Sequence, residues 1–384
     1  MKKKLFRITT VPISLEKLLE NQLRFMNGFY EITAISSDKP RLERFGEDQG
    51  VKTYHIELTR KITPLKDLKS LFKLYRFLRK EKPLIVHTHT PKAGVIGMLA
   101  SYLAKTPIRL HTVAGLPLLE AKGFKRRILN AVERITYKCA TQVYPNSHGL
   151  KQIILEEKLI KKSEKLKVLG NGSSNGIDVD YFDPDLFGDD YRKKFKDELS
   201  FDANDFVFVF VGRVVRDKGI NELIAAFLKM QRKQTKLLLV GPLESELDPL
   251  TPETLNQITN NPSIKHVGFQ KDIRPYLAVS DVLVFPSYRE GFPNVVMQAG
   301  AMGLPSIVSN INGCNEIISD KQNGLIIPVK DITAIFEAMK RTLEDPNMLN
   351  VLKENARSSI VDSYKREDMW KFILAEYQKL EGNV

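Results

Sequence analysis

The clearest structural signal in the chain is Asp281-Val-Leu-Val-Phe-Pro-Ser-Tyr-Arg-Glu-Gly-Phe-Pro-Asn-Val-Val-Met-Gln-Ala-Gly-Ala-Met-Gly-Leu-Pro305, where an apolar run leads through a polar loop into a helical pattern. Val282–Phe285 is the kind of compact apolar run that a buried parallel strand requires. Pro293 and Asn294 are typical of a helix start. Glu290 is therefore expected at the carboxyl end of a strand, where open α/β sheets bind their ligands.

The residues after this loop have helical periodicity, so the predicted helix packs one face against the sheet. The apolar positions that carry this period are Val295, Val296, Ala299 and Met302. Gln298 lies on the first turns of the same helix. Glu290 and Gln298 could together hold a hydroxylated ligand whose phosphates lie between them. A solvated loop carboxylate remains the alternative for Glu290, because strand–loop–helix units are common and do not by themselves imply function.

Composition predicts a globular chain of two domains, with 384 residues, 42% hydrophobic and 27% charged. Cys139 and Cys314 lack C-x-x-C spacing, which favours a reducing compartment and argues against a zinc site. No apolar run approaches the roughly eighteen residues of a membrane span. The basic N-terminus leads directly into strand-like Leu5–Ile8 and not into a signal-peptide core. We therefore expect a cytoplasmic protein without a membrane span.

The net charge of +13 is distributed unevenly between the two halves of the chain. Residues 1–170 hold 34 Lys and Arg against 15 Asp and Glu, whereas residues 171–384 hold 25 against 31. A basic half joined to a mildly acidic half indicates that the first half meets a polyanion, with nucleic acid and an anionic membrane surface as the candidates. A surface that serves only solubility is the alternative.

Short apolar runs alternate with helical patterns through both halves, which predicts two doubly wound parallel sheets. The expected strands are Leu5–Thr9, Glu31–Ser36, Leu84–His87, Ile108–His111, Gln142–Tyr144, Phe206–Val211, Lys236–Val240, Ile264–Val267, Val282–Phe285 and Ser306–Val308. The expected helices of the first half include Leu15–Met26, Lys66–Lys80 and Ala93–Leu103.

A segment rich in turn-forming residues, Gly170–Asp178, separates the two halves. It predicts domains at 1–170 and 181–363, a hinge at 171–180, and a ligand cleft between the facing domains. A last helix within 364–384 carries the only tryptophan, Trp370, and is expected to return to the first domain.

Three further segments place polar residues at predicted strand ends. The strand at Phe206–Val211 is followed by Gly212, which would let a ligand come close to the backbone. Arg213 and Lys218 come next and could neutralise a diphosphate. His111 ends another strand beside a small loop and suits hydrogen bonding to a sugar hydroxyl or a developing charge. A packed core histidine is the alternative for His111.

The segment His87-Thr-His-Thr-Pro-Lys-Ala-Gly-Val-Ile-Gly-Met98 follows a third strand. Thr90 could cap a helix that has Pro91 at its first position, which leaves a helix N-terminus beside Lys92 as a phosphate site. We expect His87 and His89 to point to opposite sides of the strand and therefore not to share a metal ion.

A helix is predicted at 123–138, with Lys125, Arg126 and Arg127 in its first turns. Its apolar stripe consists of Phe124, Ile128, Val132 and Ile135. Most such stripes face a core. Basic residues in a first turn oppose the helix dipole, so an anionic headgroup or phosphate explains them as well as a solvated basic patch does.

Together these motifs resemble the retaining glycosyltransferases of family 4, which have the GT-B fold, and the resemblance covers nearly the whole chain. The family pattern of two glutamates separated by seven residues stands here as Glu290-Gly-Phe-Pro-Asn-Val-Val-Met-Gln298, so the second glutamate is an amide. Gly212-Arg-Val-Val-Arg-Asp-Lys218-Gly looks like the family's diphosphate-binding segment, and His111 matches its donor-sugar histidine.

Four further segments are similar to a narrower group that extends polyprenyl-diphosphate-linked sugars in capsule, O-antigen or glycoprotein-glycan assembly. They are Thr10–Leu15, His87–Gly94, His111–Gly115 and Asn171–Asp178. The family's usual Gly-Gly loop after the first strand is replaced by Thr9-Thr-Val-Pro-Ile-Ser14, which leaves the acceptor contacts there open.

The resemblance implies metal-independent transfer from a nucleotide sugar, with UDP-N-acetylhexosamine as the favoured donor, at the inner face of the cytoplasmic membrane. It assigns catalysis to Glu290, His111, Arg213 and Lys218. The implied donor contacts are Gly212, Arg213, Lys218, Gly291, Phe292, Pro293, Asn294, Val295 and Gln298. The implied acceptor contacts are Thr10, His89, Lys92, Lys125, Arg126 and Arg127. No role is assigned to Glu316, a further carboxylate in a turn.

Several other functions compete with this one. A nucleotide-sugar 2-epimerase would need additional acid/base residues at strand ends. A non-catalytic nucleotide-sugar-binding partner in a membrane assembly is compatible with Gln298. Few aromatic residues accompany the Lys and Arg of the basic half, which disfavours nucleic acid. A dinucleotide dehydrogenase would carry G-x-G-x-x-G after the first strand, and this chain does not.

Overall fold

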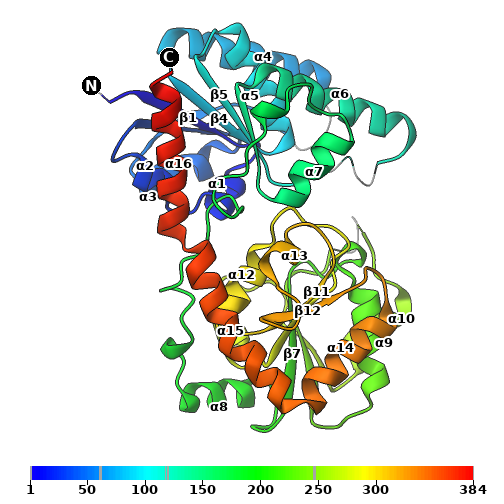
Figure 1. Ribbon diagram of the computed structural model, residues 1–384. Coiled ribbons are helices and arrows are strands. Elements are labelled where there is room, and N and C mark those ends of the chain that lie inside the picture. Colours follow the sequence, from blue (N-terminus) through cyan, green and yellow to red (C-terminus); the bar gives the residue numbers. More distant parts are fainter. Residues whose placement is uncertain (1, 60–62, 117, 119–120, 245–247, 384) are drawn as a thin grey trace. The chain divides into compact units, whose positions relative to one another are not determined.

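The computed structural model describes the whole chain except residues 1, 60–62, 117, 119–120, 245–247 and 384. The chain forms two units, Met1–Gly176 with Arg366–Val384, and Ile177–Lys365. Each unit contains one six-stranded parallel sheet flanked by helices (Figure 1). The predicted fold class, two doubly wound parallel sheets, is therefore confirmed.

The sheet of the first unit has the strand order β3-β2-β1-β4-β5-β6, with every neighbouring pair parallel. The strands are β1 (Lys4–Ile8), β2 (Glu31–Ser36), β3 (Lys52–His55), β4 (Ile85–His89), β5 (Ile108–Val113) and β6 (Gln142–Pro145). The helices are α1 (Pro12–Leu18), α2 (Gln22–Met26), α3 (Lys39–Gln49), α4 (Pro64–Glu81), α5 (Pro91–Leu103), α6 (Gly123–Cys139), α7 (His148–Glu156) and α16 (Arg366–Glu381).

The two faces of this sheet have separate apolar cores, because successive residues of a strand point to opposite faces. Phe6 and Val86 belong to the core that α4, α5 and α6 cover. Leu5 and Ile85 belong to the core that contains residues of α1, α2 and α16. The alternation continues to the ends of the strands, and there it sorts the polar residues by face.

The sheet of the second unit has the order β12-β11-β10-β7-β8-β9, again with parallel neighbours. Its strands are β7 (Phe206–Val211), β8 (Thr235–Val240), β9 (Ile264–His266), β10 (Val282–Phe285), β11 (Ser306–Ser309) and β12 (Gly324–Ile327). Its helices are α8 (Asp189–Glu198), α9 (Ile220–Met230), α10 (Pro252–Asn260), α11 (Arg274–Ala278), α12 (Asn294–Ala301), α13 (Cys314–Ile317), α14 (Ile332–Glu344) and α15 (Pro346–Tyr364).

Three elements differ from the sequence-based expectation. The single helix predicted at Leu15–Met26 is two helices, α1 and α2, because Asn21 adopts a left-handed conformation with φ of 57°. The edge strands β3 and β12 were not predicted. β3 is polar and lacks the apolar run by which buried strands are recognised. β12 does carry a short apolar run, at residues 325–327, which the sequence analysis overlooked.

No helix in the described part of the chain is long and apolar enough to cross a membrane.

Candidate active site

The carboxyl ends of strands β7 and β8 lie close together, and each strand is followed by a glycine, Gly212 and Gly241. The Gly212 N–H donates to the Val240 carbonyl at 2.9 Å. Gly241 has φ of +146°, and a Cβ atom placed on it would lie 1.8 Å from the Gly212 oxygen. A side chain at position 241 is therefore excluded, which the sequence analysis did not recognise.

A third glycine brings Lys218 to the end of β10. The 3-10 turn η4 (Arg216–Lys218) ends at Gly219, whose φ is +73° and whose added Cβ would lie 2.2 Å from the Pro286 oxygen. In this position the Lys218 Nζ forms an ion pair with Glu290 Oε1. Only 15% and 16% of the two side chains are exposed. Two motifs that lie 72 residues apart in the sequence thus meet in one contact.

Arg213 is also paired with carboxylates. Its Nη1 lies 3.1 Å from Glu244 Oε2, and its Nη2 lies 3.7 Å from Asp217 Oδ2. The same Asp217 oxygen accepts a hydrogen bond from Arg289 at 3.1 Å. The sequence analysis missed these acidic partners, although Glu244 follows the end of β8 closely enough to have been considered.

The loop that carries Glu290 is held by the segment after β11. Asn312 Nδ2 donates to the carbonyl groups of Glu290 and Gly291. A Cβ atom on Gly313 would lie 2.5 Å from the Gly291 oxygen, so this position also requires glycine. Glu316 accepts a hydrogen bond from the Gly313 N–H at 3.2 Å. This contact gives Glu316 a helix-capping role at the start of α13.

The α12 helix begins directly after the Glu290 loop, as predicted. Pro293 is its N-cap, and no side chain caps the first turn. Phe292 is buried and packs against Tyr364 with ring centroids 5.4 Å apart, so its side chain belongs to the core. Gln298 is half-buried on the second turn. Its side-chain amide makes no hydrogen bond within the described part of the chain.

In the first unit, Thr10 performs the capping that the sequence analysis expected of Thr90. Thr10 Oγ1 accepts a hydrogen bond from the Ala93 N–H of α5 at 3.3 Å, and it lies 2.8 Å from Thr90 Oγ1. Thr90 has φ of 72° and makes no side-chain cap of its own. This left-handed conformation is rare for a β-branched residue and turns its hydroxyl toward Thr10.

Lys92 does not extend from a free helix N-terminus. Its Nζ lies 2.5 Å from Asp67 Oδ2, and only 13% of its side chain is exposed. The helix N-terminus is thus occupied by Thr10, and Lys92 is paired with Asp67. The sequence did not indicate this ion pair, because Asp67 is 25 residues away and no local pattern connects the two residues. Phosphate binding at this helix stays a prediction.

The expectation that His87 and His89 point to opposite sides of the strand was wrong. Their rings stack with centroids 4.5 Å apart, because alternate residues of a strand share a face. His87 lies 2.6 Å from the Tyr377 hydroxyl, and His89 lies 2.9 Å from Arg7. No group of three or more His, Cys, Asp and Glu suited to a metal ion occurs in the part of the chain that the structure describes.

His111 lies on the opposite face of the same sheet, near the end of β5. Its Nδ1 is 2.8 Å from Thr88 Oγ1, and a Cβ atom on Gly94 would lie 2.5 Å from its ring. The ring is 2% exposed, and burial lowers the pKa of His111 to about 4. The imidazole is therefore neutral at neutral pH.

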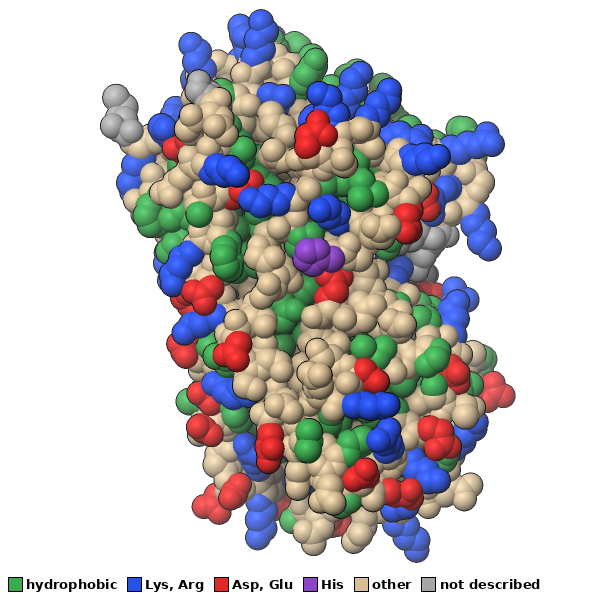
Figure 2. Space-filling view, viewed as in Figure 1, with side chains coloured by type: hydrophobic (Ala, Val, Ile, Leu, Met, Phe, Trp, Pro, Cys, Tyr) green, Lys and Arg blue, Asp and Glu red, His purple; other side chains and the backbone are tan. Residues whose placement is uncertain are grey.

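The apolar stripe predicted on α6 is only partly buried. Phe124 is 77% exposed and Ile135 is 45% exposed, whereas Ile128 and Val132 are half-buried. Arg126 pairs with Glu157 at 2.7 Å, whereas Lys125 and Arg127 are exposed. On the face shown in Figure 2, many Lys and Arg side chains and few Asp and Glu side chains cover the first unit.

The buried side of α6 carries a carboxyl group with a strongly shifted pKa. Glu133 is 6% exposed, and burial raises its pKa from 4.5 to about 7. Tyr137 lies beside His111, with ring centroids 6.0 Å apart. Glu133 is therefore close to half protonated at neutral pH.

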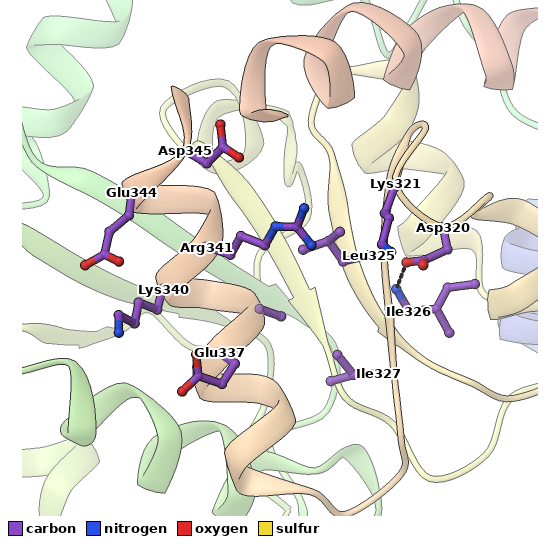
Figure 3. A pocket seen from close by; sticks show the side chains of 11 residues that line it. Asp320, Lys321, Leu325, Ile326, Ile327, Glu337, Lys340, Arg341, Glu344 and Asp345 are labelled. Carbon is purple, nitrogen blue, oxygen red and sulfur yellow. Dashed lines mark hydrogen bonds between the residues drawn. The ribbon is translucent and has the colours of Figure 1, made fainter. Parts of the chain in front are cut away.

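A groove of about 460 Å³ lies between β12 and α14, away from every residue that the sequence analysis singled out. Arg341 extends from α14 toward Leu325, while Lys340 and Glu344 point away (Figure 3). Across the groove, Asp320 Oδ1 accepts a hydrogen bond from the Ile326 N–H at 2.9 Å. Because its charged groups are of mixed sign and do not converge, this groove does not define a ligand site.

Two family models match the chain. The model for glycosyl transferases group 1 matches residues 191–359, and the model for a glycosyl transferase 4-like domain matches residues 24–172. The chain is 34% identical to the capsular polysaccharide biosynthesis glycosyltransferase CapM of Staphylococcus aureus, over 97% of the chain and 96% of CapM.

Two further comparisons agree with these matches. The chain is 32% identical to the UDP-Gal:alpha-D-GlcNAc-diphosphoundecaprenol alpha-1,3-galactosyltransferase of Escherichia coli, over 90% of the chain and 89% of that enzyme. The structure of Anabaena Alr3699/HepE in complex with UDP and glucose superposes with a TM-score of 0.82 at 18% identity, over 98% of this chain and 100% of that chain. That likeness shows the fold.

We predict that Glu133→Gln alters how stability depends on pH. A carboxyl pKa of about 7 in the folded state favours the protonated form. Its contribution is complete below the unfolded value of 4.5 and is lost as the pH rises through 7. The free energy of unfolding of the wild type should fall by about 3 kcal/mol more than that of the variant over this range, at 1.36 kcal/mol per pKa unit.

Urea unfolding at pH 5 and pH 8 measures this difference. Glu164→Gln, at an exposed glutamate of the same unit, is the control and should follow the wild type. Parallel pH profiles for the wild type and Glu133→Gln would show that Glu133 titrates normally.

Proposed function

This chain belongs to the family of group 1 glycosyl transferases, and we propose that it moves a sugar from a UDP-sugar onto a polyprenyl-diphosphate-linked sugar. The chain covers nearly all of the length of two glycosyltransferases, the capsular polysaccharide enzyme CapM and the galactosyltransferase that acts on a diphosphoundecaprenol-linked sugar. The observation that supports this proposal most directly is the contact between Lys218 and Glu290 at adjacent strand ends, with Arg213 on the same loop.

In this proposal the diphosphate of the donor takes the place of carboxylates. Lys218 and Arg213 are paired with Glu290 and Glu244. The diphosphate of a nucleotide sugar carries two negative charges, and two of its oxygens can accept the Arg213 fork in parallel bonds, so it competes well for both cations. The uncapped amides at the start of α12 add to the same anion site. Two cations and a helix terminus would stabilise the leaving diphosphate without a metal ion.

The release of Glu290 from Lys218 would free its carboxylate for the donor sugar. We propose that Glu290 then accepts hydrogen bonds from sugar hydroxyls and orients the ring, and that transfer proceeds with retention, as the family resemblance implies. Gln298, whose amide can both donate and accept, would contact the ribose hydroxyls. His111, neutral at neutral pH, would contact a sugar hydroxyl and would carry no charge.

We propose that the first unit binds the anionic inner face of the cytoplasmic membrane, where the acceptor lies. Exposed apolar residues on α4 support this proposal, because Leu65, Leu68 and Phe72 are 87%, 62% and 54% exposed. Lys66 and Lys69 lie between them in the sequence, and Lys73 follows Phe72. On α6, Phe124 lies beside Lys125 and Arg127. Apolar side chains with flanking cations are what a helix needs to lie in a lipid headgroup layer.

The competing functions are less well supported. A 2-epimerase shares the fold, but the family models and the relatives named above are glycosyltransferases. A non-catalytic partner does not explain why the loops around the Lys218–Glu290 contact are built on three positions that require glycine. Gln298 is the feature that still favours such a partner.

The test of this proposal is transfer from a panel of UDP-, GDP- and ADP-sugars to a short polyprenyl-diphosphate-linked sugar, with a chelator present. We expect product with UDP-sugars, including UDP-N-acetylhexosamines, and an α linkage in that product. Product only after a divalent metal ion is added back would disprove metal independence. Binding of a nucleotide sugar without turnover on any acceptor would favour the partner function.

We predict that Lys218→Ala lowers kcat/KM for the donor by about 10²- to 10³-fold, the usual loss when one group that stabilises charge is removed. Glu290→Gln should lower kcat by a similar factor. Steady-state kinetics with thermal unfolding in parallel separates these losses from misfolding. Lys229→Ala, at an exposed lysine of α9 in the same unit, is the control. Wild-type activity in Lys218→Ala would remove this lysine from the diphosphate site.

We predict that the protein co-sediments with liposomes that contain an anionic lipid, and that roughly 0.5 M salt weakens this binding. Leu68→Gln combined with Phe72→Gln should weaken it as well, because the apolar contact is lost. Phe269→Gln, at a 68% exposed phenylalanine of the second unit, serves as the control. Equal binding to neutral and anionic liposomes would contradict the proposed role of the basic surface.

A further inference from the structure

The first unit contains a buried cation without an anionic partner. Arg7 is 1% exposed. Its guanidinium group donates to the Tyr377 hydroxyl and to Gln22 Oε1, each at 2.6 Å, and it contacts His89 Nε2 at 2.9 Å. Within the described residues no carboxylate lies within ion-pair distance of it. A charge that is buried in this way is unfavourable unless another group compensates it.

The charge of Arg7 determines the proton positions of its neighbours. A guanidinium group only donates, so His89 Nε2 must accept and the proton of His89 lies on Nδ1. Tyr377 accepts from Arg7 and therefore donates its own proton to His87 Nδ1, which lies 2.6 Å away. His87 Nε2 then carries a proton and donates to Thr112 Oγ1 at 2.7 Å. Burial lowers the pKa values of both histidines well below their usual range, which agrees with neutral rings.

This network leaves several buried polar atoms without a hydrogen bond, and the residues that carry them line one cavity. The unpaired atoms are Arg7 Nε, His89 Nδ1, Asn146 Oδ1 and the Ser174 hydroxyl. All four residues line a cavity of about 10 Å³, which is close to the space that one water molecule needs. Leu169, Met369 and Ile373 also line it, so the cavity has an apolar side that includes residues of α16.

The chemistry of these atoms is that of an anion site. Arg7 Nε–H and His89 Nδ1–H can only donate, and the Ser174 hydroxyl can donate as well. The Asn146 amide presents either its oxygen or, when rotated, its NH₂ group. A bound water would use its two lone pairs on these donors and would leave the positive charge uncompensated. A single-atom anion accepts from all of them and neutralises Arg7.

We propose that the first unit binds one small monovalent anion, of the size of chloride, between Arg7, His89, Asn146 and Ser174. The cavity is too small for a phosphate or a carboxylate, and because chloride is larger than water, its binding requires the lining side chains to move slightly apart. This site is separate from the proposed donor and acceptor chemistry, and it assigns His89 to the anion and not to the acceptor sugar. The anion would join Arg7 of β1 and His89 of β4 to Ser174 in the loop before Ile177. The hydrogen bond between Arg7 and Tyr377 of α16 lies beside it.

The direct test is a crystal of the full chain soaked in sodium bromide, with data collected at the bromine absorption edge. We expect an anomalous peak inside the cavity, next to Arg7 and His89. Peaks that occur only at surface lysines, or a refined water in the cavity, would overturn the proposal.

A solution test uses the line width of the chloride NMR signal. The wild type should broaden it in a saturable way, and bromide should compete. Arg7→Met should abolish the broadening. Ser174→Ala removes one donor but keeps the charge, and it should weaken chloride binding at least about fivefold. Ser163→Ala, at an exposed serine of the same unit, should resemble the wild type.

If Arg7→Met fails to fold, the Ser174→Ala variant still tests whether chloride binds in the cavity. Broadening that Ser174→Ala and Ser163→Ala leave equally unchanged would mean that chloride binds elsewhere. Neither assay uses a nucleotide sugar. The proposed anion site can therefore be disproved while the proposed transferase activity is confirmed, and the reverse is also possible.

Discussion

Parallel strand pairing is the constraint on which the arrangement of polar residues depends. In a parallel sheet all strands end at the same edge, and the interior of each strand is apolar because both of its faces are covered. Polar residues therefore gather at the strand ends, where the alternation of the strand sorts them by face. Arg7, His87 and His89 lie on one face with Tyr377 of α16, while Thr88 and His111 lie on the other face with α5.

The cations of the two units have different partners. In the second unit Lys218 and the partly exposed Arg213 are paired with carboxylates, and in the proposed function the donor diphosphate replaces these carboxylates. In the first unit Arg7 is surrounded by neutral groups, so its charge instead directs a chain of hydrogen bonds through Tyr377 and His87. An exchangeable pair suits a site that binds and releases substrate, whereas the Arg7 network suits a fixed position for α16.

The cations on the surface of the first unit fall into two groups, those in ion pairs and those that are exposed. Lys92 and Arg126 form ion pairs with Asp67 and Glu157, so they stabilise the unit and contribute little outward charge. Lys125 and Arg127 remain exposed, beside the exposed ring of Phe124. The combination of unpaired cations with exposed apolar side chains distinguishes this surface from one that serves only solubility.

The sequence by itself determined most of the fold, because ten of the twelve strands in the described residues were predicted from their short apolar runs. It also identified Glu290, Lys218 and the start of α12, since turn residues and glycines mark strand ends locally. The tertiary structure alone decided which partners these residues have. Asn312, Glu244, Asp67 and Tyr377 come from distant parts of the chain, and no local period connects them to their contacts. For the same reason the cap that Thr10 provides in place of Thr90, the ion pair of Lys92 and the buried charge of Arg7 became visible only when the strands were assembled side by side.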